Sequence, residues 1–156
     1  MFREMRRKDK MKTREEALEI IRQCTNGVLS VTGDGGYPYG VPISYVYSNE
    51  KIYFHCASEG HKLDAVKADS RVSFTVIGAD NIAPDKFTTM YKSAIVFGRA
   101  EIVKNEEERT AALKAIIDKY SGQFPKEGAK YIEDNRSNTT VVGISIEHIT
   151  GKGLAK

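Results

Sequence analysis

The chain has 156 residues, of which 40% are hydrophobic and 29% charged. This length and balance are typical of one folded domain and exclude a disordered chain, because enough apolar surface is available to bury a core. The formal net charge is +3, and much of the positive excess lies in the first twelve residues. We therefore expect a basic N-terminal arm (1–12) and a single domain (13–156).

Several classes of protein are disfavoured by the same composition. The longest apolar runs are strand-sized, far below the ~20 residues of a membrane-spanning helix, and the basic arm lacks the apolar core of a signal peptide. The two cysteines, Cys24 and Cys56, have no CxxC spacing, which favours reduced thiols and a cytoplasmic location. No stripe of aromatic and basic residues continues from the arm, so we expect a solvated extension or a subunit contact rather than nucleic-acid binding, and no metal site.

The first predicted element is a helix from about Arg14 to Cys24. Thr13 and Glu16 have the spacing of a capping box, in which each side chain accepts a hydrogen bond from a free amide at the helix start. Asn26 and Gly27 supply a left-handed stop after the apolar face ends.

Extended segments follow, and their tight turns predict a three-stranded antiparallel meander. Its strands are Val28–Val31, Tyr37–Tyr47 and Ile52–Cys56. Pro38 and Pro42 cannot donate to a ladder, so the second strand needs an open edge, a bulge or a ligand beside it.

The rest of the chain alternates between helical and extended patterns. The expected elements are a helix over His61–Ala68, a strand over Val72–Ile77, a loop with Pro84, a strand over Ser93–Val103, a helix from Asn105 to near Gly122, a short helix after Pro125 and a last strand over Thr139–Ile146. About six antiparallel strands with flanking helices give a mainly β fold, and their short spacing favours a closed or partly closed barrel.

The segment from Phe54 to Lys62 joins a strand to a helix through small residues. A helix start exposes main-chain amides and the positive end of the helix dipole, and Ser58, His61 and Lys62 add donors. This combination suits a phosphate group. The alternative is an ordinary N-capped helix whose side chains are solvated.

Parts of the sequence resemble the pyridoxamine-phosphate-oxidase-like FMN-binding split barrels, in particular the Nim-type (5-nitroimidazole resistance) branch. The matching pieces include Gly40–Tyr45, Phe54–Ala57 and Gly60–Ala65, and the similarity is less clear over Gly78–Met90 and Gly122–Ser137. The resemblance implies a split barrel that holds FMN at the interface of a homodimer. Ile95 and Phe97 are candidates for that interface, although burial in the core would explain them equally well.

The resemblance also implies roles for individual residues. The cofactor-binding positions are Val41, Pro42, Ile43, Ser44, Tyr45, His55, Cys56, Ser58, His61, Lys62 and Ser93. The first five offer main-chain groups to the flavin, while His61 and Lys62 hold its phosphate with a histidine in place of the usual arginine. Ser93 stands where the oxidases have a glutamine. Strand alternation turns Cys56 toward the core.

His55 matches a histidine that Nim-type proteins place beside the flavin. The implied function is an FMN-dependent reductase that passes electrons from an unidentified donor to a small-molecule acceptor, with His55 as catalytic residue. His55 as a structural residue, a non-catalytic FMN- or heme-binding protein, and an interaction module without a cofactor are the alternatives. The chain has no Gly-x-Gly-x-x-Gly motif for a Rossmann-type site, and it ends where the oxidases continue with substrate-binding arginines, which disfavours a vitamin-phosphate oxidase.

Overall fold

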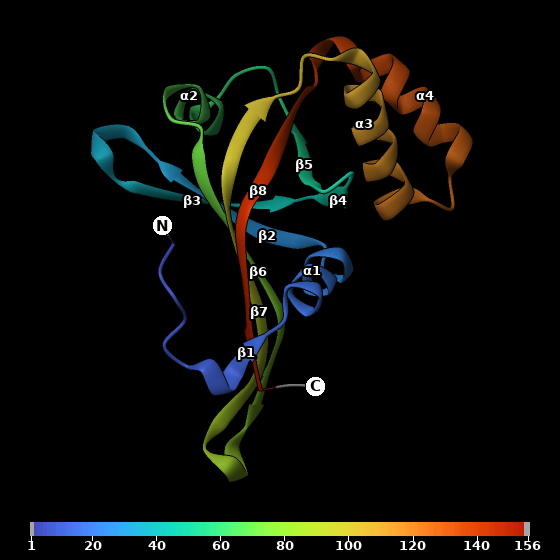
Figure 1. The fold of residues 1–156 in the computed structure, drawn as a ribbon. Coiled ribbons are helices and arrows are strands. Elements are labelled where there is room, and N and C mark those ends of the chain that lie inside the picture. The colour runs from blue at the N-terminus through green and yellow to red at the C-terminus, as the bar shows by residue number, and fades with distance from the viewer. Residues whose placement is uncertain (1, 155–156) are drawn as a thin grey trace.

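The computed structural model describes residues 2–154, in which eight strands form one curled antiparallel sheet (Figure 1). The strands are β1 (Met11–Lys12), β2 (Asn26–Thr32), β3 (Pro38–Ser44), β4 (Val46–Ser48), β5 (Lys51–Cys56), β6 (Arg71–Ala83), β7 (Thr88–Ile102) and β8 (Thr140–Gly153). Their order in the sheet is β3-β2-β6-β7-β8-β5-β4, and β1 pairs with β8. The four helices are α1 (Arg14–Gln23), α2 (His61–Ala68), α3 (Glu106–Ser121) and α4 (Pro125–Asn135).

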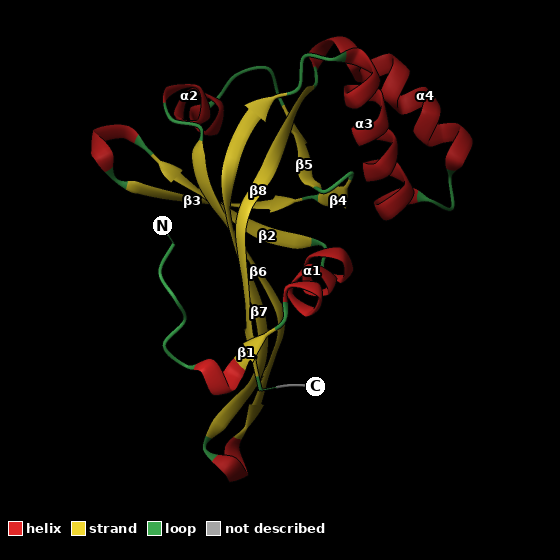
Figure 2. Ribbon diagram, viewed as in Figure 1, coloured by secondary structure: helices red, strands yellow, loops and turns green. Residues whose placement is uncertain are grey.

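The hydrophobic core lies inside the curl of the sheet, because alternate residues of each strand turn inward. Leu29 of β2, Phe74 of β6 and Val96 of β7 are fully buried and stand opposite one another in a single row across the three strands. Helices α1 and α2 add apolar side chains to this core, while α3 and α4 pack against each other over a second, smaller cluster (Figure 2). The predicted class, mainly β with flanking helices, is confirmed.

Helix α1 begins as its sequence predicts. The Thr13 hydroxyl accepts from the Glu16 amide at 3.2 Å, and the Glu16 carboxylate accepts from the Thr13 amide at 2.6 Å. These bonds satisfy two amides that have no partner within the helix.

Thr13→Ala removes one of these two capping bonds. We expect the free energy of unfolding to fall by about 1 kcal/mol, the usual effect of losing an N-cap side chain. Urea denaturation followed by circular dichroism measures the change, and Thr110→Ala inside α3 is a comparison that loses a hydrogen bond from Arg136 but no capping bond. An unchanged midpoint for Thr13→Ala would show that the capping box adds no stability.

The predicted meander is wrong in one respect. Its second strand is divided at Tyr45 into β3, which pairs with β2, and β4, which pairs with β5. The cause lies far away in the sequence, because the main-chain N–H of Tyr45 donates to the Tyr120 hydroxyl of α3 instead of to a neighbouring strand. The two halves of the strand can therefore join different parts of the sheet.

Two strands are longer than their local patterns predict. The expected loop around Pro84 is the end of a ribbon in which β6 and β7 stay paired as far as Ala83 and Thr88, and this ribbon projects from the barrel (Figure 1). The last strand is expected to end at Ile146, but β8 continues to Gly153 because it pairs with both β7 and β1. In both places the ladder supplies hydrogen bonds to residues with little apolar alternation.

The N-terminal arm lies against its own chain. Met11 and Lys12 pair with Lys152 and Gly151 of β8, and the Phe2 ring stacks on His148 with centroids 4.7 Å apart. Among residues 2–154, no helix has the length and apolar character needed to cross a membrane.

Candidate functional site

Strand β3 is the open edge of the sheet, as its prolines predict. It stands at the end of the strand order, and Pro42 lies opposite Val28 of β2. The side chains of Val41 and Ile43 turn toward the core, whereas those of Pro42 and Ser44 are exposed on the outer face. A ligand at this edge would therefore meet the main-chain groups on the unpaired side of β3 rather than the side chains of Val41 and Ile43.

The turn between β5 and α2 leads into a helix start without a side-chain cap. Gly60 occupies the N-cap position with φ 137°, a conformation that favours glycine, and no side chain of residues 2–154 caps the helix. The amides of Leu63 and Asp64 donate to the Gly60 carbonyl. Those of His61 and Lys62 have no carbonyl to reach within the helix and remain available for an anion. The alternative of a conventionally capped helix does not describe this turn.

His61 holds the start of α2 against the hairpin formed by β2 and β3. Its ring stacks on Tyr39 with centroids 4.2 Å apart, and its Nε2 accepts a hydrogen bond of 3.3 Å from the Asp34 amide. A neutral imidazole that accepts at Nε2 carries its proton on Nδ1, which can donate to a ligand. The structure thus brings the predicted anion-binding turn beside β3.

Lys62 and Cys56 are also neighbours. Burial raises the pKa of the Cys56 thiol, and the positive charge of Lys62 opposes this effect only in part. The thiol is therefore protonated near pH 7, and its side chain packs against the barrel core, as alternation along β5 predicts. Ser58 is exposed in the turn between these two residues.

His55 faces the other side of β5, toward helices α3 and α4. It lines a small, mainly apolar hollow together with Leu113 and Ile116 of α3 and Tyr131 of α4. His55 keeps an exposed surface, but the groups around it reduce its solvation and lower the pKa of the imidazole below its usual value of 6.5, so the neutral form predominates at pH 7. A neutral histidine still has one N–H to donate.

Ser93 is not beside β3 in the same chain. It lies on β7 opposite Ile77 and Lys152, and strands β2 and β6 separate it from the edge. Three strand spacings of ~4.8 Å correspond to roughly 14 Å along the sheet. Its side chain shares the outer face with Ile95 and Phe97, because Ala94 and Val96 between them are buried.

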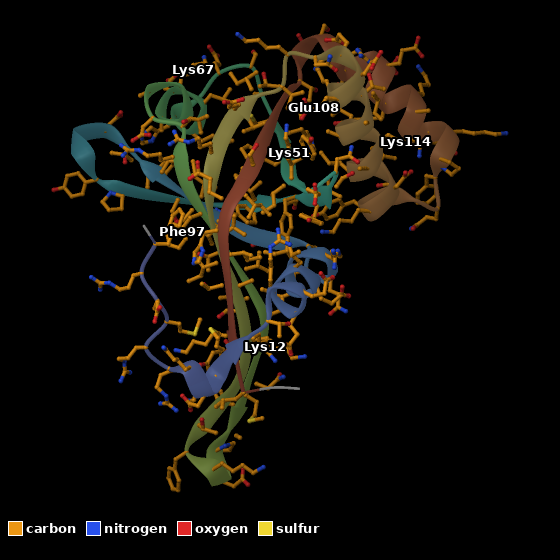
Figure 3. All side chains as sticks on the ribbon, viewed as in Figure 1. Lys12, Lys51, Lys67, Phe97, Glu108 and Lys114 are labelled. Carbon is orange, nitrogen blue, oxygen red and sulfur yellow. The ribbon has the colours of Figure 1, made fainter. Side chains whose placement is uncertain are left out.

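On the outer face of the sheet, two rows of cross-strand partners run over five neighbouring strands and contain no Asp, Glu, Lys or Arg. One row runs Pro42, Val28, Thr75, Ile95 and Thr150, and the next runs Gly40, Ser30, Ser73, Phe97 and His148. Ile95 and Phe97 are 36% and 37% exposed in the single chain, so core burial does not explain them. Figure 3 shows Phe97 on the side along which the N-terminal arm runs, and its ring centroid lies 5.4 Å from that of Phe2.

Some residues around the site have no signal in the local sequence. They are Asp34, Tyr39, Lys119, Tyr120 and His148. The acidic turn residue and the aromatic residue beside His61 look like ordinary hairpin residues, and Tyr120 looks like part of an apolar helix face. Their contacts join segments 22 to 146 residues apart, which only a folded chain reveals. Within residues 2–154, no group of three metal-ligating side chains comes together.

A family model described as pyridoxamine 5'-phosphate oxidase matches residues 13–153. The chain therefore belongs to the pyridoxamine 5'-phosphate oxidase family. Its curled sheet, open edge and uncapped helix start define the class of protein: a member of this family with the split-barrel fold. No significant match was found among curated proteins.

Three solved structures illustrate the likeness in fold. A proposed 5-nitroimidazole antibiotic resistance protein from Bacteroides thetaiotaomicron is 24% identical, with a TM-score of 0.76 over 90% of this chain and 84% of that chain. A conserved hypothetical protein from Mycobacterium tuberculosis is 19% identical, with a TM-score of 0.82 over 96% and 90%. A protein from Mycobacterium smegmatis, described as binding FAD and heme, is 18% identical, with a TM-score of 0.77 over 92% and 73%.

Proposed function

We propose that this protein binds FMN and acts as a flavin-dependent reductase of a small molecule. The observation that carries the proposal is the uncapped start of α2, with His61 and Lys62, held against the open edge of β3. Membership of the pyridoxamine 5'-phosphate oxidase family supports it, and several proteins of similar fold are described as binding a flavin.

The chain's own residues divide the task of holding FMN. The amides at the start of α2, the Lys62 ammonium and the Ser58 hydroxyl suit the phosphate, because they offer donors and positive charge at one turn. Main-chain groups of Val41–Ser44 at the open edge suit the polar rim of the ring system. When bound, FMN supplies hydride or electron transfer, and the protein supplies position and electrostatics.

The absorbance spectrum of the purified protein tests the proposal directly. Bound flavin gives two visible bands, whereas heme gives one intense violet band, which matters because one protein of similar fold is described as binding both FAD and heme. The apoprotein should take up FMN with restored absorbance and bind FAD and riboflavin less well. Uptake of heme with no uptake of FMN would favour the alternative of a heme-binding protein.

Turnover separates a reductase from a flavin-binding protein without catalysis. The FMN-loaded protein is reduced chemically without air and then mixed with a nitroimidazole or another small electron acceptor. Oxidation of the protein faster than that of free reduced FMN supports the reductase. Oxidation no faster than that of free reduced FMN would favour a flavin-binding protein without catalysis.

We also propose that the protein is a homodimer whose subunits meet through the uncharged outer face. An exposed sheet face with two rows free of charge is typical of a surface that becomes buried on association. Ser93 lies on this face, so the dimer brings it toward the partner's surface. This arrangement accounts for a predicted flavin contact that lies away from β3 in its own chain.

Phe97→Asp should convert the dimer into a monomer. A carboxylate without a partner in an apolar interface is strongly unfavourable, and a loss of about 3 kcal/mol raises the dimer Kd roughly a hundredfold. Light scattering of the FMN-loaded protein over a range of concentrations measures the change. Phe124→Asp is the matched control, because Phe124 is 52% exposed but lies just before α4, away from the outer face. A monomer for the wild type, or a stable dimer for Phe97→Asp, would contradict the proposal.

A further inference from the structure

The corner between β3 and β4 consists of a single residue, Tyr45, whose main-chain groups have partners outside the sheet. Its N–H donates to the Tyr120 hydroxyl of α3 at 2.9 Å. The same hydroxyl lies 2.7 Å from the Tyr45 carbonyl and 2.6 Å from the Thr25 carbonyl. A hydroxyl has one proton, so Tyr120 donates to one of these carbonyls at a time while it accepts from the amide.

Lys119, the residue before Tyr120, holds the same corner. Its ammonium donates to the Tyr45 carbonyl at 3.0 Å and to the Cys24 carbonyl at 2.5 Å. It also lies 4.3 Å from the centroid of the Tyr45 ring. Burial lowers the pKa of Lys119, which shows that solvent around this ammonium is reduced. Water competes less for its hydrogen bonds than it does at an exposed lysine.

The side chain of Tyr45 is anchored as well. Its ring is buried and meets the edge of Phe74 with centroids 4.9 Å apart, and its hydroxyl donates to the Ile21 carbonyl at 2.6 Å. Ile21 belongs to the last turn of α1, where carbonyls lack partners within the helix. Tyr45 is therefore held by α1 through its side chain and by α3 through its main chain.

These contacts matter because β3 pairs with only one strand, β2, and its other edge is open. The last pair of that ladder is Ser44 with Asn26, directly before the corner. Without Tyr120, the Tyr45 amide would be buried with no strand to accept its hydrogen bond. The chain around Ser44 would then have to move to reach water or another acceptor.

We infer that Lys119 and Tyr120 are positioning residues for the cofactor: by holding Tyr45, they set the position of the main-chain groups of β3 that face FMN. This inference rests on the proposed function, because it takes Val41–Ser44 as the strand along which FMN binds. It assigns to the C-terminal end of α3 a role in cofactor affinity, although neither side chain has to touch the cofactor.

Two matched substitutions separate positioning from general stability. Tyr120→Phe removes the hydroxyl at the corner, and Tyr53→Phe removes the hydroxyl with which β5 donates to Glu108 Oε1 of α3 at 2.7 Å. Glu108 lies in the first turn of α3 and Lys119 in its last turn, and Figure 3 shows Glu108 near Lys51 of β5. Each variant loses one hydroxyl link between α3 and the sheet. Urea denaturation should show a loss of stability in both variants, larger in Tyr120→Phe because its hydroxyl both accepts from the Tyr45 amide and donates to a carbonyl.

FMN affinity should distinguish them. Tyr120→Phe should bind FMN roughly five- to tenfold more weakly, the size expected from one lost hydrogen bond, and Tyr53→Phe should bind within about twofold of the wild type. At saturating FMN, the visible circular dichroism of the bound flavin should change in Tyr120→Phe only, because that signal reports the ring's surroundings rather than the stability of the protein.

A second pair of variants covers the case in which Tyr120→Phe fails to fold. Lys119→Met should weaken FMN several-fold, and Lys119→Arg should recover most of the affinity, because a guanidinium can still donate to both carbonyls. Lys114→Met is the control on the same helix, since Lys114 is exposed and pairs only with Asp118 one turn away.

The results distinguish a failure of FMN binding from a failure of the positioning role. A wild-type protein that binds no FMN overturns the proposed function and this inference with it. A wild type that binds FMN, together with Tyr120→Phe and Lys119→Met proteins of unchanged affinity and flavin spectrum, overturns only the positioning role. Equal losses of affinity in Tyr120→Phe and Tyr53→Phe would also overturn it, because they would reflect stability alone.

Discussion

His55→Ala should keep FMN bound but slow the reduction of a nitroimidazole roughly 10²–10⁴-fold, the usual contribution of a general acid. The candidate phosphate ligands lie on α2 and its preceding turn, whereas His55 faces α3 and α4, so the substitution leaves the phosphate-binding groups intact. The effect requires the flavin ring to reach the α3 and α4 side of β5, where the imidazole would donate a hydrogen bond or a proton to the acceptor as electrons arrive.

Rapid mixing of chemically reduced, FMN-loaded protein with a nitroimidazole measures this step. His55→Gln is the informative companion, because its amide donates a hydrogen bond but cannot release a proton. A rate in His55→Gln between those of His55→Ala and the wild type would indicate that His55 acts through a hydrogen bond. A rate as low as that of His55→Ala would indicate that it transfers a proton. Equal rates for His55→Ala and the wild type would make His55 a structural residue, and loss of FMN would make it part of the cofactor pocket.

The pH dependence of the same step follows from the environment of His55. Burial lowers the pKa of the imidazole below 6.5, so the cationic form accumulates only in mildly acidic solution. If the cation is the proton donor, the wild-type rate should rise as the pH falls through this lowered pKa. The rate of His55→Ala should stay level over that range. Parallel profiles for the two proteins would assign the pH dependence to the flavin or to the acceptor.

Lys62→Ala should weaken FMN ten- to a hundredfold. A charge-assisted hydrogen bond to a phosphate is worth on the order of 1.5–3 kcal/mol, and Lys62 lies at the start of α2, where the helix dipole also favours an anion. Fluorescence titration of the apoprotein with FMN measures the dissociation constant. Lys67→Ala is the matched control, since Lys67 lies in the last turn of the same helix and is exposed.

Comparison with riboflavin shows how much of the binding affinity comes from the phosphate of FMN. It lacks the phosphate, so it should bind more weakly than FMN to the wild type and equally well to Lys62→Ala. A Lys62→Ala protein with wild-type affinity for FMN would remove the phosphate from this turn. Equal weakening of FMN and riboflavin would show that the substitution disturbs the site as a whole.

Features set by neighbouring residues could be predicted from the sequence. The capping groups of Thr13 and Asn105 lie within three residues of the amides that they bind, so α1 and α3 begin where expected. Alternation along β5 predicted that Cys56 turns toward the core. Pro38 and Pro42 predicted an open edge, a bulge or a ligand beside the second strand, and β3 stands at an end of the strand order. The turn from β5 into α2 also follows from local sequence.

Other features depend on contacts between distant segments. The division of a predicted strand at Tyr45 is decided by Lys119 and Tyr120, which lie 74 and 75 residues later in the chain. The length of β8 is decided by its pairing with β7 and β1, and the place of His61 beside Tyr39 by the docking of α2 on a hairpin.

The sequence by itself therefore determined most of the helices and strands, the helix caps and the candidate residues for binding a phosphate. The tertiary structure alone decided where β3 ends, which face of β5 presents His55 and which rows of the sheet's outer face carry no Asp, Glu, Lys or Arg. The reason is physical: caps and alternation act over a few residues, whereas the partner of a main-chain group at a strand's end is chosen only when distant segments pack together.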